Sequence, residues 1–209
     1  MTSPDQTGPE PAGTDPAGAG TDVHEPELWL IRHGETEWSR NRRHTGRSDL
    51  PLTPEGERAA RALAPRLDGV SFDLVLASPL TRARHTAELA GLSPQLEPLA
   101  QEWDYGEYEG ITTAQIQVDR PGWSVWNDPI PGGESLEQVA ERADAVIARI
   151  RSQAPKRAAL VAHAHFLRIL TVRWIEQEPR LAARFNLEVS TISMLGWDRG
   201  VPVIDRWNG

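Results

Sequence analysis

The chain has 209 residues, a mass of 23.1 kDa and a net charge of −8, which allows one domain with a substantial core. It contains no cysteine, so disulfides, thiolate nucleophiles and zinc–sulfur sites are excluded. The negative charge argues against binding to the phosphate backbone of nucleic acids. Because no apolar run approaches the roughly 18 residues of a membrane span and no secretory signal opens the sequence, we expect a cytoplasmic protein without nucleic-acid or membrane partners.

Residues 1–26 differ in composition from the rest of the chain. They contain five prolines, four glycines and five acidic residues, with no Lys or Arg. Such a segment buries too little apolar surface to offset its ordering entropy, so we predict a disordered acidic tail. Residues 27–209 then form a single domain, and their own net charge is only −3.

Short apolar runs and capped amphipathic segments alternate along this domain. Thr53-Pro54-Glu55 opens a helix with a hydroxyl cap and a proline in the first turn. Ser78-Pro79 is expected to cap a second helix, and Ser135 with Gln138 fits a capping box. The expected strands are 28–31, 72–77, 158–162, 189–197 and 201–207, and the expected helices are about 54–68, 79–91, 136–152 and 164–177.

This alternation predicts an α/β fold, a three-layer sandwich with a mostly parallel central sheet flanked by helices. Three of the strands are followed by residues of catalytic or ligand-binding type. These are Arg32-His33, Ser78 with Arg82 about one helical turn later, and His163-Ala164-His165. Ligands of open α/β sheets bind beyond the carboxyl ends of the strands. We therefore expect these side chains to share one crevice, in which arginines bind an oxyanion. A histidine beside two arginines is expected to have a lowered pKa and to be a neutral nucleophile.

Four motifs in this order resemble those of the histidine phosphatase (phosphoglycerate mutase-like) superfamily. Arg-His-Gly-Glu-Thr at 32–36 is similar to its signature, and SPLTRARHTA at 78–87 to its second arginine motif. EWDYGEYEG begins at the position of the family's acid, Glu102, and HAHFLR at that of its second histidine, His163. The strings EWDYGEYEG, PGGES and HAHFLR also resemble the acid phosphatases and sugar-bisphosphatases of the family.

The resemblance implies a role for each matching residue. His33 attacks phosphorus, while Arg32, Arg82 and His163 clamp the phosphoryl oxygens. Glu102 donates a proton to the leaving oxygen and then activates water. No metal or other cofactor is implied, because the arginines supply the positive charge. The resemblance places substrate contacts at Ser39, Thr45, Gly46, Tyr105 and His165.

Several positions have a competing interpretation. The role of Glu102 has rivals in Asp104, Glu107 and Glu109, and Arg82 has a rival in Arg84. His163 and His165 also fit a metal site of the His-x-His kind. His44 and His85 are expected on the surface, whereas Trp103, Trp123 and Trp126 lie either at the mouth of the site or in the core.

One residue departs from the family pattern. Ala164 stands where the family usually has glycine after the second histidine. If that position required a positive φ, the methyl group would cost about 1–2 kcal/mol and displace His163. We expect the site to tolerate alanine, the smallest available change.

The sequence favours a metal-independent phosphomonoester hydrolase that acts through phosphohistidine on small phosphorylated metabolites, with sugar phosphates as candidates. The stretch 111–134 holds a single basic residue, Arg120. The mutases of the family have several basic residues in the corresponding insertion, and these retain a bisphosphorylated intermediate. A 2,3-bisphosphoglycerate-dependent phosphoglycerate mutase and a non-catalytic phospho-ligand binder stay as alternatives. The last strand, around 201–207, is a candidate for pairing across a homodimer.

Overall fold

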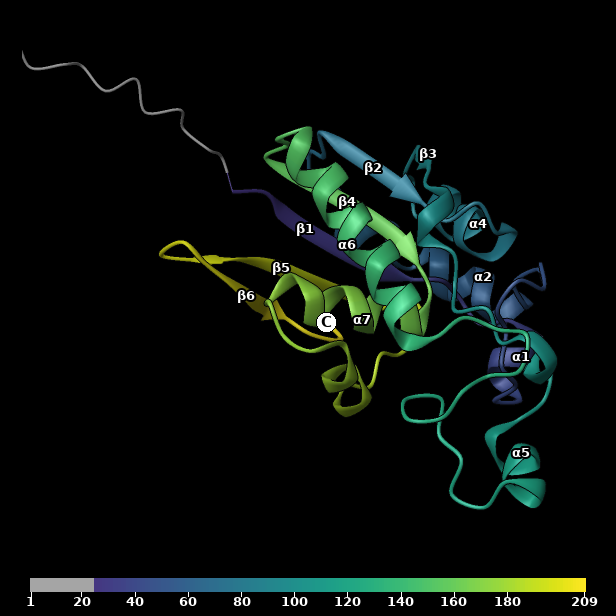
Figure 1. The fold of residues 1–209 in the computed structure, drawn as a ribbon. Coiled ribbons are helices and arrows are strands. Elements are labelled where there is room, and N and C mark those ends of the chain that lie inside the picture. The colour runs from purple at the N-terminus through teal and green to yellow at the C-terminus, as the bar shows by residue number, and fades with distance from the viewer. Residues whose placement is uncertain (1–24) are drawn as a thin grey trace, which may run out of the picture.

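The computed structural model describes residues 25–209, which fold around a six-stranded sheet with the order β3-β2-β4-β1-β5-β6 (Figure 1). Three of the five strand pairings are parallel, and β5 and β6 run antiparallel to their neighbours. This confirms the predicted α/β fold with a mostly parallel sheet. The strands are β1 (Glu27–Arg32), β2 (Leu74–Ala77), β3 (Gln95–Leu96), β4 (Arg157–Ala162), β5 (Ile192–Asp198) and β6 (Val201–Arg206).

Helices cover both faces of the sheet. The α-helices are α1 (Glu37–Arg40), α2 (Pro54–Arg61), α3 (Ala64–Leu67), α4 (Thr81–Leu89), α5 (Thr113–Asp119), α6 (Leu136–Ser152) and α7 (Ala164–Trp174). Three 3-10 helices are η1 (Pro98–Ala100), η2 (Gly106–Tyr108) and η3 (Pro179–Arg184).

The alternation of side chains along β1 separates two cores. Leu28 and Leu30 pack in the larger core, which holds the buried faces of α6 and α7. Ile31 points to the other face, where it joins a smaller core with Leu63 and Ala83 from the segments around α3 and α4. Because successive side chains of a strand face opposite ways, this arrangement produces the three predicted layers.

The sequence predicts some elements closely and others only in part. Helix α6 matches the predicted range of 136–152, and its Ser135–Gln138 capping box is confirmed. The helix predicted at about 54–68 is instead two, α2 and α3, which are separated at Ala62-Leu63. Ser78 does not cap a helix, because α4 begins at Thr81 and Leu80 is its N-cap residue.

The loops and short helices between β3 and α6 extend away from the sheet, and α5 lies at their far end (Figure 1). These segments stand on the side of the sheet where β1 and β4 end. Within residues 25–209 no helix is long and apolar enough to cross a membrane. The prediction of a disordered tail concerns residues that, up to position 24, lie outside the described part of the chain.

Candidate active site

Three neighbouring parallel strands bring the predicted site residues to one edge of the sheet. His33 directly follows β1, and its backbone N–H donates to the carbonyl oxygen of Ala162 at the end of β4 (3.0 Å). His163 directly follows β4, so its ring centroid lies 5.1 Å from that of His33. Ser78 follows β2 on the other side of β4. The expected convergence at the carboxyl ends of the strands is therefore observed.

The His33 ring has a fixed orientation. Its Nδ1 lies 2.7 Å from the carbonyl oxygen of Gly34, an acceptor, so Nδ1 carries the proton. In a neutral imidazole this leaves the lone pair on Nε2. Burial lowers the pKa of His33 well below its usual range, and the charges of Arg82 and Arg32 lower it further. His33 thus presents a neutral ring in the cavity that it lines.

Arg82 and His163 are fully buried behind His33 and are not among the residues that line the cavity. Arg82 donates from Nε to His163 Nδ1 (3.2 Å) and from its terminal nitrogens to the carbonyls of Thr45, Gly46 and Ser48. His163 accepts at Nδ1, so its Nε2 carries the proton and donates to Ser78 Oγ (2.8 Å). Four of the five N–H groups of Arg82 are therefore used within the protein.

Arg32 lines the cavity beside His33. One of its terminal nitrogens donates to the carbonyl oxygen of Leu187. Its buried Nε has no hydrogen-bond partner within the described residues. Since buried polar groups are nearly always satisfied, this N–H is available to an anionic ligand. Burial lowers the pKa of Arg32, while the nearby carboxylates Glu102 and Glu188 act in the opposite direction.

Glu102 is held at the N-terminus of α7. Its Oε1 accepts from the backbone N–H groups of Trp103 and Phe166 (both 2.9 Å), and its Oε2 accepts from that of His165 (3.0 Å). The free N–H groups of a helix start stabilise a carboxylate there. Glu102 is buried and lines the cavity.

The three rival acids are placed differently. Asp104 accepts from the backbone N–H of Gly106 (2.9 Å), Glu107 is exposed, and Glu109 binds the N–H groups of Gly46 and Ser48. None of the three lines the cavity. The rival arginine, Arg84, does not line it either.

The predicted substrate contacts divide into two groups. Ser39, Thr45, Tyr105 and His165 line the cavity. Gly46 does not, because it is buried between Glu109, which accepts from its N–H, and Arg82, which donates to its carbonyl. Its position supports the loop that holds Arg82. Ala164 is the first residue of α7 and has no positive φ, so the methyl group causes no backbone strain there.

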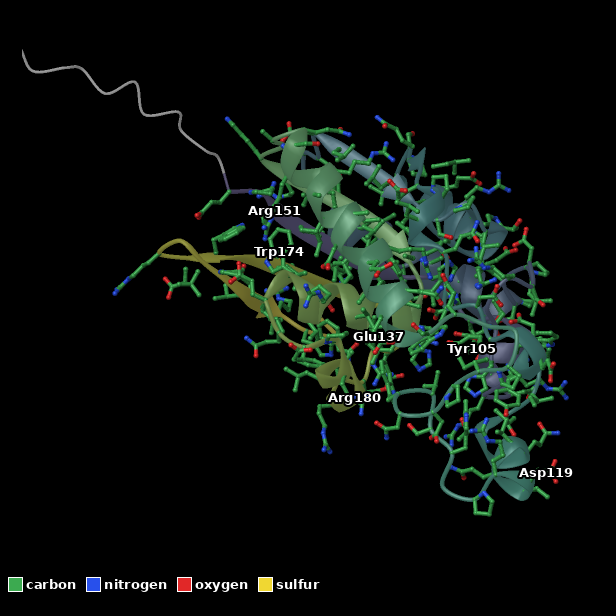
Figure 2. The ribbon with its side chains drawn as sticks, in the orientation of Figure 1. Tyr105, Asp119, Glu137, Arg151, Trp174 and Arg180 are labelled. Carbon is green, nitrogen blue, oxygen red and sulfur yellow. The ribbon has the colours of Figure 1, made fainter. Side chains whose placement is uncertain are left out.

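The cavity has a volume of about 670 Å³ and a strongly aromatic wall. Tyr105, which lies among the loops beyond the end of the sheet (Figure 2), lines it. Besides the ring of His33, the other aromatic rings are those of His44, Trp123, Trp126 and His165. Trp103, by contrast, is buried and does not line the cavity. The cationic side chains along the wall are Arg32, Arg42, Arg43 and Arg168.

The prediction of a surface position for His44 is wrong. Its ring is only 9% exposed and lies 4.7 Å from the ring of Tyr105 and 5.7 Å from that of Trp123. Burial lowers the pKa of His44 to about 4. The residues that precede His44 in the sequence are charged, a pattern typical of the surface. The aromatic residues that cover its ring come from segments some 60 to 80 positions away. No local signal identifies it.

Among residues 25–209 no group of three or more His, Asp and Glu side chains is arranged to hold a metal ion. The nitrogens of His163 bind Arg82 and Ser78, and His165 Nδ1 binds the hydroxyl of Tyr105 (2.6 Å). The His-x-His pair is thus engaged in two separate hydrogen-bond networks.

The model of the histidine phosphatase superfamily (branch 1) matches residues 28–209. An acid phosphatase of Mycobacterium tuberculosis is 39% identical and aligns with 86% of this chain and 90% of its own. Sedoheptulose 1,7-bisphosphatase of Saccharomyces cerevisiae is 33% identical, over 71% of this chain and 67% of its own.

A solved structure of an open reading frame from Mycobacterium tuberculosis superimposes with a TM-score of 0.83 at 37% identity, covering 88% of this chain and 97% of that one. The family match, the named relatives and the common fold agree with the histidine and arginine residues at the strand ends. The chain is therefore a phosphoric monoester hydrolase of the histidine phosphatase superfamily, branch 1.

Proposed function

We propose that this protein removes phosphate from small phosphorylated metabolites through a phosphohistidine at His33. The observation that carries the proposal is the tautomer of His33: Nδ1 is tied to the carbonyl oxygen of Gly34, which leaves the Nε2 lone pair for the cavity. A neutral imidazole with a fixed tautomer beside two guanidinium groups is suited to attack a bound phosphoryl group.

The reaction has two displacements at phosphorus. First, His33 Nε2 forms a bond to phosphorus while the bond to the leaving oxygen breaks, and Glu102 in its protonated form gives that oxygen a proton and becomes a carboxylate. Then Glu102 takes a proton from water as the water oxygen attacks phosphorus, the P–N bond breaks and inorganic phosphate forms. Arg32, through its unpartnered Nε, and Arg82, through its remaining N–H, stabilise the charge that spreads over the phosphoryl oxygens.

His163 is buried and does not line the cavity, so it acts through the residues that it contacts. Both of its ring nitrogens are engaged, with Arg82 and with Ser78, so in this arrangement it orients the guanidinium of Arg82. A direct bond from His163 to the phosphoryl group, as the family resemblance implies, requires its bond to Ser78 to be exchanged on substrate binding.

The stretch 111–134 gives the mutase alternative no support. Arg120, the basic residue of the stretch 111–134, donates to the hydroxyl of Tyr108 (2.8 Å) and to the carbonyl oxygen of Pro129 (3.2 Å) and does not line the cavity. That stretch therefore contributes no cation to the cavity, whose arginines all come from other segments.

The test is release of inorganic phosphate at pH 5 to 7 in EDTA, with His33→Ala in parallel. The substrates are p-nitrophenyl phosphate, 3-phosphoglycerate, fructose 1,6-bisphosphate and sedoheptulose 1,7-bisphosphate. We expect release by the wild type and none above background by the variant. Isomerisation of phosphoglycerate that depends on 2,3-bisphosphoglycerate would identify a mutase instead. Binding of phosphate by the folded protein without any turnover would identify a non-catalytic binder.

Two further expectations stay predictions from the sequence. One is a cytoplasmic location without nucleic-acid or membrane partners. The other is a homodimer formed through β6, whose outer edge has no neighbouring strand among residues 25–209 and whose Val201 is exposed.

A further inference from the structure

Glu109 is a carboxylate of the EWDYGEYEG motif that the two displacements at phosphorus do not use. It does not line the cavity. Its Oε1 accepts from the backbone N–H groups of Gly46 (2.9 Å) and Ser48 (3.1 Å), and its Oε2 lies 3.0 Å from the nitrogen of Gly46. Both oxygens of the carboxylate are therefore bound to the backbone of one loop, residues 45–48.

The same loop holds the guanidinium of Arg82. Arg82 donates to the carbonyl oxygens of Thr45 (3.2 Å), Gly46 (3.0 Å) and Ser48 (2.8 Å). The carbonyl of Thr45 and the N–H of Gly46 belong to one peptide group, and in a planar trans peptide they point in opposite directions. This peptide group therefore lies between the Glu109 carboxylate and the Arg82 guanidinium and is bound to both.

Backbone pairing places Glu109 against this loop. The N–H of His44 donates to the carbonyl oxygen of Ile111, and the carbonyl of His44 accepts from the N–H of Gly110 (both 2.9 Å). The contact is close, because a Cβ atom added to Gly46 would lie 2.8 Å from Glu109 Oε2. Within the described residues the loop itself forms no backbone–backbone hydrogen bond. The orientation of its peptide groups thus depends on the bonds to Glu109 and Arg82.

The charge of Arg82 has no direct carboxylate partner among its four hydrogen bonds. Three of the acceptors are carbonyl oxygens, and the fourth is the neutral ring of His163. Burial lowers the pKa of Arg82, and the carboxylates of Glu102, Asp49 and Glu109 act in the opposite direction. A carboxylate bound directly to the guanidinium would compete with a phosphoryl group for the same N–H donors. Glu109 is one peptide group away, so it does not compete.

We propose that Glu109 is a positioning residue of the reaction: it holds the 45–48 loop so that three carbonyl groups of the loop keep Arg82 aimed at the phosphoryl oxygens. Glu109 itself contacts neither the substrate nor the reacting atoms and transfers no proton. This inference rests on the proposed function, because it requires Arg82 to bind the phosphoryl group.

The first test compares two substitutions of Glu109. Glu109→Ala should lower kcat/KM by about 10- to 100-fold, because displacement of a binding group by about 1 Å can cost about 100-fold. Its inhibition constant for orthovanadate, an anion that the same donors bind, should rise by about tenfold or more. Glu109→Gln should retain most of the activity, because one amide oxygen in the place of Oε1 can accept from both N–H groups. Glutamine cannot transfer a proton, so this rescue separates positioning from acid catalysis.

The second test compares two leaving groups. p-Nitrophenolate leaves without a proton, whereas the alkoxide of glycerol 3-phosphate requires one. Glu109→Ala should lower kcat/KM for both substrates by the same factor, because Arg82 acts on the phosphoryl group that they share. Glu102→Gln, which removes the proton donor, should lower kcat/KM for glycerol 3-phosphate much more than for p-nitrophenyl phosphate.

A double-mutant cycle tests whether Glu109 acts through Arg82. In Arg82→Ala no guanidinium remains to be positioned, so adding Glu109→Ala should lower the remaining kcat/KM for p-nitrophenyl phosphate by no more than about twofold.

Asp73→Ala is the matched control for removal of a carboxylate that binds backbone N–H groups. Asp73 Oδ2 accepts from the N–H groups of Lys156 (2.8 Å) and Arg157 (3.1 Å), and Asp73 precedes β2, at the end of the sheet away from the site. Asp73→Ala should lower the urea midpoint and leave kcat/KM unchanged.

The outcomes distinguish failure of the inference from failure of the proposed function. Wild-type kcat/KM in folded Glu109→Ala, a loss confined to glycerol 3-phosphate, or an equal loss in Glu109→Gln would overturn the inference. An effect of Glu109→Ala that is as large without the Arg82 side chain as with it would overturn it as well. If Glu109→Ala does not fold, Glu109→Met, which fills similar space without an acceptor, takes its place. Full activity in Arg82→Ala, or no hydrolysis by the folded wild type, would show that the proposed function itself is wrong.

Discussion

The tautomer of His33 and its connection to α4 both depend on the backbone of Gly34. The Gly34 carbonyl fixes the tautomer of His33, and its N–H donates to the hydroxyl of Thr86 on α4 (2.9 Å). The Thr86 hydroxyl in turn donates to the carbonyl oxygen of Arg82 (2.7 Å). The nucleophile and the buried arginine are therefore connected by two hydrogen bonds through a single hydroxyl group.

Glycine is required at position 34 by space. A Cβ atom there would lie 2.6 Å from the carbonyl oxygen of Gly56 in α2 and 3.2 Å from the side chain of Leu52. Because a backbone atom cannot move aside cheaply, we expect Gly34→Ala to lower the free energy of unfolding by about 1–3 kcal/mol. It should also lower kcat, since the displaced carbonyl no longer fixes His33. Urea denaturation and phosphate release measure the two effects.

A control variant isolates the catalytic part of this prediction. Thr53→Ala removes the side-chain cap of α2, which accepts from the N–H of Gly56 (3.0 Å), without adding an atom next to Gly34. It should reduce stability by about 1 kcal/mol and affect kcat less than Gly34→Ala does. An unchanged unfolding midpoint in Gly34→Ala would contradict the steric argument.

The residues of the site differ in how far the sequence reveals them. His33, Arg82 and His163 are predictable because each follows a buried strand within a few positions, and parallel strands end at one edge. Trp126 and His44 are not, because their places in the cavity wall depend on how the long connection between β3 and α6 folds back over the sheet. Their neighbours in space are distant in the sequence, and no periodic pattern records such contacts.

At the scale of elements, α6 shows how a strong local pattern determines a helix. Its apolar residues recur at helical spacing, and seven of them are buried. Ser135 Oγ accepts from the N–H of Gln138 (3.3 Å), whose side chain accepts from the N–H of Ser135 (2.8 Å). We expect Ser135→Ala to lower the free energy of unfolding by about 1 kcal/mol, measured as a shift of the urea midpoint.

Helix α5 offers a matched comparison, since Thr112 and Gln115 form the same kind of capping box. This helix has seven residues and buries only Ile116. A helix with so little buried surface can open locally without global unfolding. Thr112→Ala should therefore move the urea midpoint less than Ser135→Ala does, and an equal or larger shift would contradict this view of α5.

Weaker local patterns explain where the predicted elements differ from the observed ones. Strand β3 has only two residues, and both are exposed, so it has no apolar run to detect. The helix predicted at about 54–68 divides at Ala62-Leu63 because Pro65, in the first turn of α3, has no backbone N–H with which to continue α2. Ser78 has the sequence of a cap, yet its hydroxyl serves His163 instead. Of these three cases, only that of Ser78 is decided by a tertiary contact.

At the scale of the whole molecule, two separate parts of the chain complete the site. The sheet supplies His33, Arg32 and His163 at the ends of its central strands. The connection between β3 and α6 supplies Glu102 and the Tyr105, Trp123 and Trp126 rings of the wall, and α7 joins the two parts because its first N–H groups bind Glu102. Conditions that separate the connection from the sheet should thus remove the acid together with Tyr105, Trp123 and Trp126.

Acid is such a condition, because four buried histidines are neutral in the folded protein: His33, His44, His163 and His165. In the unfolded chain a histidine takes up a proton near pH 6.5. The folded pKa values are lower, so the unfolded state binds more protons and the free energy of unfolding falls as the pH falls below about 6.5. For His44, with a folded pKa of about 4, the loss between pH 7.5 and 5.0 is about 2 kcal/mol.

Urea midpoints at pH 7.5 and 5.0 measure this loss of unfolding free energy. In His44→Phe the loss should be smaller, because the unfolded chain then has one histidine fewer to protonate. A wild-type midpoint that does not change between pH 7.5 and 5.0 would contradict the assignment of neutral buried rings. Activity should follow a different curve, because the attack by His33 depends on its pKa in the folded state, which lies well below its usual range. At pH 5.0 and at urea concentrations too low to unfold the protein, we therefore expect phosphate release to persist. The urea midpoint at the same pH should be lower than at pH 7.5.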